Sequence, residues 1–209
     1  MTESKNNNGA DAPQADGTGG AGSGGAHAGA DAALRALAGG TPRAPTAEDE
    51  AYPIEIRADG TWYYHGSPIG RLPMVRLFAT VLRRDTAGDY WLITPAERGR
   101  ITVEDAPFVA VGLTVEGSGH DQRLVFRTNL DQEVIAGPDY PIRVQTDSET
   151  GEPRPYIMVK GPPEAPLEAR INRAIFYELV ERSEPGQDDG MIGVWSQGAF
   201  FPLGRATEG

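Results

Sequence analysis

The sequence IEIRADGTWYYHGSPI, residues 54–69, alternates apolar and polar side chains on both sides of Asp59-Gly60. An Asp-Gly pair between two alternating runs is typical of a tight β-hairpin, because glycine accepts the positive φ of such a turn. The hydrophobic period then changes from two to 3.6. Four apolar residues fall on one helical face: Val75, Phe78, Val81 and Leu82. We therefore expect a hairpin followed by a helix that ends near Asp85.

Similar signals continue along the chain after this helix. Short alternating segments predict further strands at residues 90–94, 101–103, 108–117, 123–129, 133–137, 142–146 and 155–160. A second amphipathic helix is predicted from about Pro166 by Leu167, Ile171, Ile175, Leu179 and Val180. Residues 191–196 and 200–204 predict a closing hairpin that turns at Gln197-Gly198.

The two predicted helices align with each other. RLFATVLRR, residues 76–84, pairs with AIFYELVER, residues 174–182, and each is followed by a glycine-containing turn and two short strands. Amphipathic helices can resemble one another by chance, but the shared order of elements favours a duplication. We predict an α+β protein of two similar small domains, residues 46–119 and 120–205, each an antiparallel sheet with one main helix.

Residues 1–45 form a tail of different composition. Glycine and alanine fill 21 of the first 40 positions, and no aromatic residue precedes Tyr52. Such a segment buries too little apolar surface to offset the entropy lost on ordering, so we expect disorder. The alternative is a short helix around Leu34 and Leu37, capped by Asp31, which would need a tertiary contact for stability.

Charge and composition exclude several classes of protein. The net charge of −11 leaves no general attraction for phosphate backbones, so we expect no nucleic-acid partner. The chain has no cysteine, which rules out disulfides and cysteine metal sites. It shows no secretory signal pattern and no apolar run of membrane-spanning length. These features predict a cytoplasmic protein without a membrane partner.

Catalytic and cofactor signals are weak. His65 lies beside Ser67, and His120 lies beside Ser118, but both histidines fall in glycine-rich turns where polar residues are expected. No histidine spacing suits a metal site, and the folded part lacks both common glycine-rich phosphate loops. We therefore predict no metal, no cofactor and no catalytic residue.

Arginines near the two helices suggest anion binding. Of the 19 basic residues most are arginine, whose planar guanidinium binds carboxylates and phosphates through paired N–H donors. The predicted ligand-binding residues are Arg71, Arg76, Asn129, Arg154, Tyr156 and Arg173. The alternative is ordinary structural use: exposed helix arginines, a core Tyr156 and a turn-capping Asn129.

Several stretches resemble one bacterial family. They are DGTWYYHGSPIGR, MVRLFATVLRRD, WLITPAERGRITVEDAPFVAV, FRTN, RPYIMV and GVWSQGAFFPLG. Together they make the chain after the tail similar to the family described as domain of unknown function 1285. The resemblance implies a cytoplasmic protein of two similar α+β domains, with ligand binding or signal transduction suggested. It supplies no catalytic residues.

These observations favour a ligand-binding or signalling module that holds a small anion or a peptide in a cleft between the domains. The alternative is a protein-interaction or assembly module without a small-molecule ligand, which could form a homodimer through a sheet edge or an aromatic patch. An enzyme ranks third, as a hydrolase that uses His65 or His120.

Overall fold

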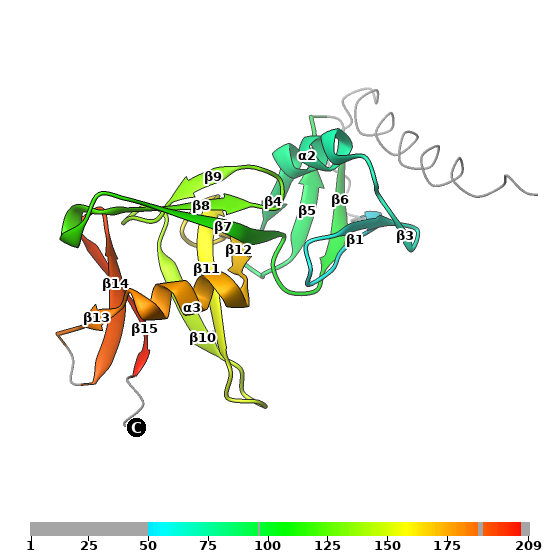
Figure 1. The fold of residues 1–209 in the computed structure, drawn as a ribbon. Coiled ribbons are helices and arrows are strands. Elements are labelled where there is room, and N and C mark those ends of the chain that lie inside the picture. The colour runs from blue at the N-terminus through cyan, green and yellow to red at the C-terminus, as the bar shows by residue number, and fades with distance from the viewer. Residues whose placement is uncertain (1–49, 96, 188–189, 206–209) are drawn as a thin grey trace, which may run out of the picture.

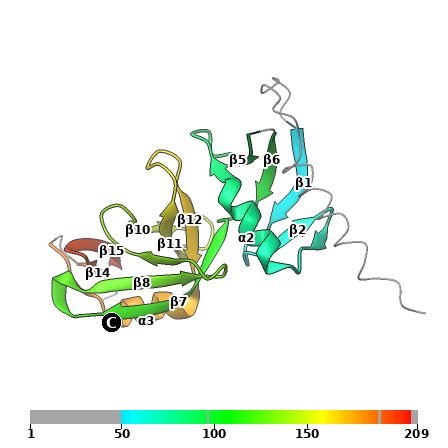
Figure 2. The ribbon, with the colours of Figure 1, turned by 90° about the horizontal axis from the view of Figure 1, so that it is seen from above.

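A computed structural model describes residues 50–95, 97–187 and 190–205. The predicted tail, with its alternative helix around Leu34, lies outside the described residues. The described chain forms two units of mixed α+β structure, mostly sheet, with two α-helices. Figures 1 and 2 show the first unit, which carries α2, beside the second unit, which carries α3.

Six strands form the first sheet: β1 (Glu50–Ile56), β2 (Trp62–Tyr64), β3 (Ser67–Pro68), β4 (Leu82–Arg84), β5 (Tyr90–Ile93) and β6 (Arg98–Val103). Their order is β3-β2-β1-β6-β5-β4. Antiparallel pairing of β1 with β2 confirms the predicted hairpin. The central strands β1 and β6 are parallel, so the prediction of a wholly antiparallel sheet is wrong at this pair.

Helix α2 (Leu72–Val81) crosses one face of this sheet and connects its two halves. A proline in its first turn suits the helix start, where the first N–H groups have no intrahelical acceptor. Phe78 is buried and its ring stacks on Trp62 with centroids 6.1 Å apart. The helix ends before Asp85, as Leu82 already pairs with Leu92 in the β4–β5 ladder.

Six more strands form the second sheet: β7 (Phe108–Glu116), β8 (Arg123–Thr128), β9 (Glu133–Ile135), β10 (Ile142–Thr146), β11 (Pro153–Lys160) and β12 (Leu167–Ile171). Their order is β10-β11-β12-β7-β8-β9, and the central pair β12 and β7 is again parallel. Strand β7 pairs only within this sheet among the described strands. The division between the sheets therefore precedes Phe108, whereas the predicted boundary at residue 119 placed β7 in the first domain.

The two six-stranded sheets share one topology. Read from its other edge, the second sheet runs β9-β8-β7-β12-β11-β10, which matches the first sheet strand for strand. Each sheet thus joins two three-stranded antiparallel halves through a parallel pair. In the first sheet a helix connects the halves, but α3 follows the last strand of the second sheet. The shared strand order agrees with a duplication of one ancestral unit, which stays a prediction.

Helix α3 (Arg173–Glu181) is shorter than predicted, because residues 167–171 form β12 and not helix. Every second side chain of β12, at Leu167, Ala169 and Ile171, is buried in the core. Asn172 then caps the N-terminus of α3. A third sheet follows, with β13 (Glu184–Pro185), β14 (Met191–Ser196) and β15 (Ala199–Arg205). Pairing of Ser196 with Ala199 confirms the predicted closing hairpin.

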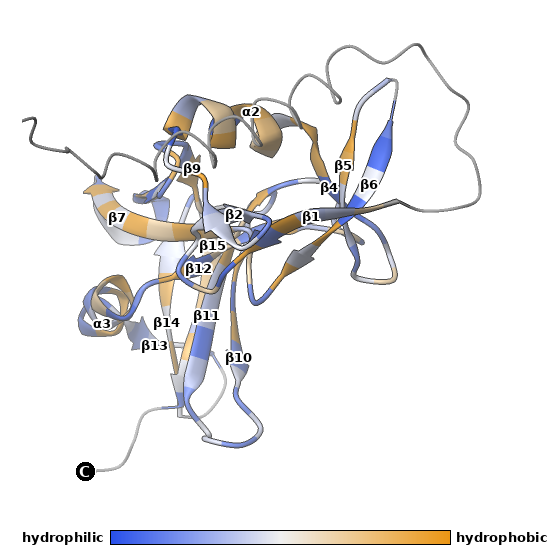
Figure 3. Ribbon diagram, turned by 90° about the vertical axis from the view of Figure 1, so that its right-hand side faces the viewer, coloured by the Kyte–Doolittle hydropathy of each residue, from blue (hydrophilic) through white to orange (hydrophobic). Residues whose placement is uncertain are grey.

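A short 3-10 helix, η1 (Gly119–Asp121), lies against the turn of this hairpin. With the sheet of β13, β14 and β15, the second unit contains two sheets, whereas a single sheet was predicted. Figure 3 shows apolar stretches along the strands, while the β10–β11 turn is hydrophilic. Neither α2 nor α3 has the length and apolar character needed to cross a bilayer, and the described residues contain no other α-helix.

Candidate functional site

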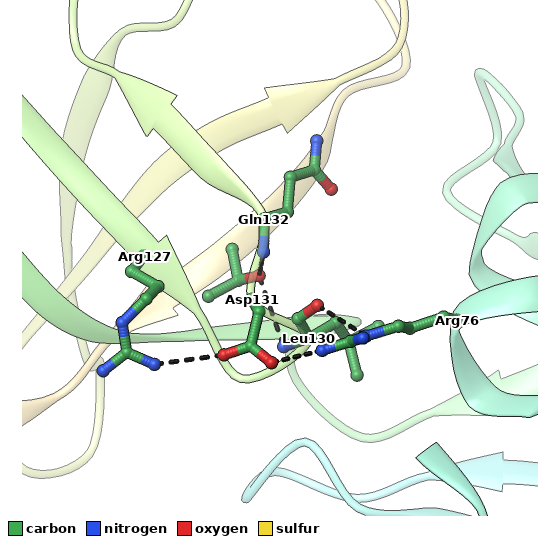
Figure 4. Close-up of polar contacts among 6 residues, drawn as sticks. Arg76, Arg127, Leu130, Asp131 and Gln132 are labelled. Atoms are coloured by element: carbon green, nitrogen blue, oxygen red, sulfur yellow. Dashed lines mark hydrogen bonds and ion pairs between the residues drawn. The ribbon is translucent and has the colours of Figure 1, made fainter. Parts of the chain in front are cut away.

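Contacts between the two units involve two of the predicted ligand-binding residues. Arg76 of α2 donates from Nε to the Leu130 carbonyl oxygen, 3.0 Å away, in the turn between β8 and β9. Its Nη2 also pairs with Asp131, to which Arg127 donates at 3.2 Å (Figure 4). The Arg76 side chain therefore links α2 to the second unit.

Asn129 forms a second link in the same region. Its Oδ1 accepts from the Val109 main-chain N–H at 3.1 Å, and its Nδ2 donates to the Gly60 carbonyl oxygen at 3.1 Å. Gly60 is buried in the predicted hairpin turn with φ of 80°. A Cβ on Gly60 would lie 2.5 Å from Asn129 Nδ2, so glycine permits this close approach of the two units.

A third link comes from β11. Lys160 Nζ donates to the Ala79 carbonyl oxygen near the end of α2. Burial, and to a smaller extent the charge of Arg83, lowers the pKa of Lys160. Half-buried charged groups with main-chain partners are typical of a fixed interface, because an unpaired charge there would be costly.

Tyr156 lies at the centre of a row of side chains that crosses the second sheet. The strand register places Arg143 on one side of it and Arg170 on the other. Both guanidinium carbons lie over its ring, 4.3 Å and 5.1 Å from the centroid. The hydroxyl donates to Asp105 Oδ1 at 2.6 Å. Burial, and then this hydrogen bond, raises the pKa of Tyr156.

Arg143 and Arg170 differ in their polar partners. Arg143 donates to both carboxylate oxygens of Glu168, which is a bidentate pair. Arg170 has a buried Nη1 for which the described part of the chain supplies no acceptor. Arg170 Nη1 is thus buried without an acceptor among the described residues, while the guanidinium lies over the Tyr156 ring.

A groove of about 430 Å³ lies where β12 ends and α3 begins. Its lining comprises Ala58, Val109, Glu152, Pro153, Pro155, Arg170, Ile171, Asn172, Arg173, Phe176 and Tyr177. Ala58 belongs to the β1–β2 turn of the first unit, and the other residues belong to the second. The groove is thus formed mostly by one unit and touched by the other.

The amino-terminal end of α3 contributes to this groove. Asn172 Oδ1 accepts from the Ile175 N–H at 2.9 Å, which satisfies one of the helix N–H groups that lack intrahelical acceptors. The first turn contains no acidic residue. Main-chain N–H groups and the helix dipole favour an anion at such a position.

Arg173 lies at the rim of the groove. Its Nη2 is 3.4 Å from Glu152 Oε1, and the two side chains are 71% and 63% exposed. An ion pair this exposed contributes little, so an incoming anion can replace Glu152 at small cost. The lining residues include Arg170, Arg173 and Glu152, and the Arg170 guanidinium lies over the Tyr156 ring.

Of the six predicted residues, Arg173 alone lines the groove. Arg154 pairs with Asp147 at 2.6 Å beside the β10–β11 turn, and the Arg71 carbonyl oxygen accepts from the Met74 and Val75 N–H groups of α2. The sequence-based prediction omitted Asn172 and Phe176. The signal for Asn172 was present, because an asparagine between a strand and a helix marks a helix N-terminus.

The two histidines considered for catalysis lie apart from the groove. The His120 ring stacks on Trp195 with centroids 4.0 Å apart, and His65 contacts Tyr64 edge-on at 4.5 Å. Neither ring is hydrogen-bonded to a serine within the described ranges. Among all residues that the structure describes, no three His, Asp or Glu side chains are placed to hold a metal ion.

Comparison with known proteins agrees with the two units. Residues 44–106 match a family model described as "Domain of unknown function (DUF1285), N-terminal domain", and residues 107–203 match "Protein of unknown function (DUF1285), C-terminal domain". The two family models divide the chain between residues 106 and 107, just before β7. The strand pairing divides it at the same place, because β7 pairs only within the second sheet among the described strands. No protein with a curated description matches the chain.

Two solved structures are similar. A DUF1285 family protein from Silicibacter pomeroyi DSS-3 is 40% identical, with 84% of this chain and 96% of that chain covered and a TM-score of 0.71. A DUF1285 family protein from Shewanella baltica OS155 is 26% identical, with 62% and 91% covered and a TM-score of 0.47. The resemblance noted in the sequence is confirmed, and this chain belongs to the DUF1285 family of bacterial proteins.

Proposed function

We propose that this chain binds a small anionic ligand in the groove at the start of α3. The observation that carries the proposal is that Arg170 and Arg173 both line the groove beside the N-terminus of α3. The Arg173 guanidinium and the first main-chain N–H groups of α3 favour the same charge, and both belong to the start of this helix in a protein of net charge −11. The ligand would therefore meet a cationic site on an acidic surface.

Contact with both units supports a regulatory use of this binding. Ala58 lines the groove, and Gly60 in the same turn accepts the hydrogen bond from Asn129. A ligand that contacts Ala58 can alter the position of this turn and so the contact between the units. A signalling module needs such a coupling between ligand and domain contact.

A thermal-shift screen of the full chain with formate, acetate, succinate and phosphate tests the proposal, since a ligand that prefers the folded state raises its melting temperature. We expect a saturable rise in the wild type that is lost in Arg173→Ala. Arg182→Ala is the matched control, because Arg182 follows the same helix and is exposed but lies outside the groove. Equal shifts in all three proteins would refute binding at this site.

Protein interaction is the second candidate, and exposed apolar residues favour it. Leu72 and Leu77 of α2 are 39% and 47% exposed, and Val180 of α3 is 36% exposed. Apolar side chains on an outer helix surface can bind a partner or a second copy of the chain. Light scattering after size exclusion tests this: a dimer that Leu77→Lys dissociates supports assembly, and a monomer at all concentrations removes the homodimer.

A further inference from the structure

The turn between β8 and β9 brings together cationic side chains from both units. Arg76 of α2 and Arg127 of β8 both contact the carboxylate of Asp131 in this turn (Figure 4). Each carboxylate oxygen faces a different guanidinium, with Oδ2 beside Arg76 and Oδ1 beside Arg127. Paired guanidinium groups are also the means by which proteins bind phosphates and external carboxylates. Here the oxyanion between them belongs to the protein itself.

The two guanidinium groups have further contacts that do not involve Asp131. Arg76 Nε donates to the Leu130 carbonyl oxygen at 3.0 Å. Arg127 lies against the backbone of β7 at Gly112, where a Cβ would stand 3.4 Å from both its Nε and its Nη2. The positions of both groups therefore depend on other parts of the chain as well as on the carboxylate.

The backbone of the turn is also held without the Asp131 side chain. The buried Thr128 hydroxyl accepts from the Leu130 and Gln132 N–H groups, at 3.3 and 3.1 Å. The Thr128 carbonyl oxygen accepts from the Asp131 N–H, and the Thr128 N–H donates to the Gln132 carbonyl oxygen. Asp131 has φ of 59°, a conformation that glycine adopts freely. The carboxylate can thus turn into solvent while the main chain of the turn stays in place.

All three charged side chains are accessible to solvent. Arg76, Arg127 and Asp131 are 44%, 52% and 54% exposed. Ion pairs this exposed contribute little, so an external anion can replace the Asp131 carboxylate at small cost. Two positive charges then remain, and a dianion matches both of them. A phosphoryl group has an oxygen for each guanidinium and further oxygens that stay in water.

From these features we infer a second anion site at the β8–β9 turn, where a phosphoryl dianion binds Arg76 and Arg127 in place of the Asp131 carboxylate. The site shares no residue with the groove at the start of α3. Because the two arginines belong to different units, the bound anion takes over the link between α2 and β8. The inference goes beyond the proposed function, and either can fail without the other.

An NMR titration of the full chain with inorganic phosphate tests the inference. The titration uses Arg173→Ala, which removes the anion contact of the groove and leaves the β8–β9 turn intact. Sodium chloride of equal ionic strength is the reference, at a mildly alkaline pH where phosphate is mainly a dianion. We expect saturable shifts of the Asp131 and Gln132 amides and of the Arg76 Nε–H group with phosphate, and no such shifts with chloride.

Variants in the same background test the displacement. Asp131→Gly removes the competing carboxylate at a position that suits glycine, so phosphate should bind about tenfold more tightly. Glu133→Gln is the matched control, because Glu133 is exposed and lies across from Arg127 in the strand register. It should tighten binding by less than about threefold, since solvent screens its charge. Arg76→Gln and Arg127→Gln should each abolish the phosphate-dependent shifts.

Three results would overturn the inference. The first is that chloride produces the same shifts as phosphate, or that neither salt produces a saturable shift at this turn. The second is that Asp131→Gly binds phosphate no more tightly than Glu133→Gln does. The third is that the shifts persist in both arginine variants. None of these results bears on the groove, where acetate binding that depends on Arg173 would still support the proposed function.

Discussion

The close approach of Gly60 and Asn129 gives a quantitative prediction about the contact between the units. Asn129→Ala removes two hydrogen bonds, to the Val109 N–H and to the Gly60 carbonyl. At about 1 kcal/mol for each bond, the unfolding free energy should fall by about 2 kcal/mol. The loss should be felt in both units, because the side chain connects them.

Gly60→Ala perturbs the same contact from the other side. A left-handed conformation costs a non-glycine residue about 1 kcal/mol, and φ at Gly60 is 80°. The new Cβ would also displace Asn129, whose Nδ2 would lie only 2.5 Å from it. Loss of the Asn129 hydrogen bonds then adds up to about 2 kcal/mol, so the total should reach about 3 kcal/mol.

A double-mutant cycle measured by urea unfolding tests this reasoning. In the Asn129→Ala background the Gly60→Ala change should cost mainly the backbone strain, about 1 kcal/mol, with a smaller cost from the new Cβ against Val109 Cγ2 at 3.0 Å. The double mutant should therefore be more stable than additivity predicts by about 1–2 kcal/mol. Additive effects within about 0.5 kcal/mol would show that Gly60 and Asn129 do not interact as described.

Three further predictions concern the core and pH dependence. Phe78→Ala, at a 1% exposed site, should lower the unfolding free energy by about 3–5 kcal/mol in urea, while Tyr177→Ala on the surface should change it little. Ser196→Ala should cost about 2 kcal/mol in the same assay, because its buried hydroxyl bonds a main-chain N–H and a carbonyl. Main-chain N–H bonds from Thr150 and Glu149 lower the pKa of Asp147, so its stabilisation is complete above the ordinary aspartate pKa of about 3.9 and disappears as pH falls through the lowered value. Asp147→Asn should therefore be less stable than the wild type at neutral pH, and unfolding curves at decreasing pH should show the difference shrinking; a constant difference would contradict this assignment.

Local patterns in the sequence predicted the local structure well. The Asp59-Gly60 pair between alternating segments and the turn at Gln197-Gly198 both gave hairpins, because tight turns depend on neighbouring residues. The segment 167–171 was predicted as helix because Leu167 and Ile171 are four residues apart, as on one face of a helix. The same two positions also fit the two-residue period of a strand. In the structure this segment is a strand, with Leu167, Ala169 and Ile171 buried in the core. The segment's own sequence does not reveal this burial, because the core contacts come from distant parts of the chain.

Long-range pairing could not be predicted from these patterns. The parallel pairs β1–β6 and β12–β7 join segments that are far apart in sequence, and alternation alone does not tell parallel from antiparallel neighbours. For the same reason β7 was assigned to the wrong unit. Its partners β8 and β12 both lie in the second sheet.

The candidate site was predictable in chemistry more than in position. Arginine near the second helix suggested anion binding, and Arg173 does line the groove. Arg76 was predicted by the same argument, but its donors contact Leu130 and Asp131 across the interface. Sequence could not separate these two arginines, because the difference lies in which acceptor the fold brings to each.

The central claim is that the groove at the start of α3 binds an anion, and an NMR titration of the full chain with acetate tests it most directly. We predict saturable amide shifts that centre on Arg170, Asn172 and Arg173 and that vanish in Arg173→Ala but persist in Arg182→Ala. Shifts that centre elsewhere, or no saturable shifts at all, would contradict the claim.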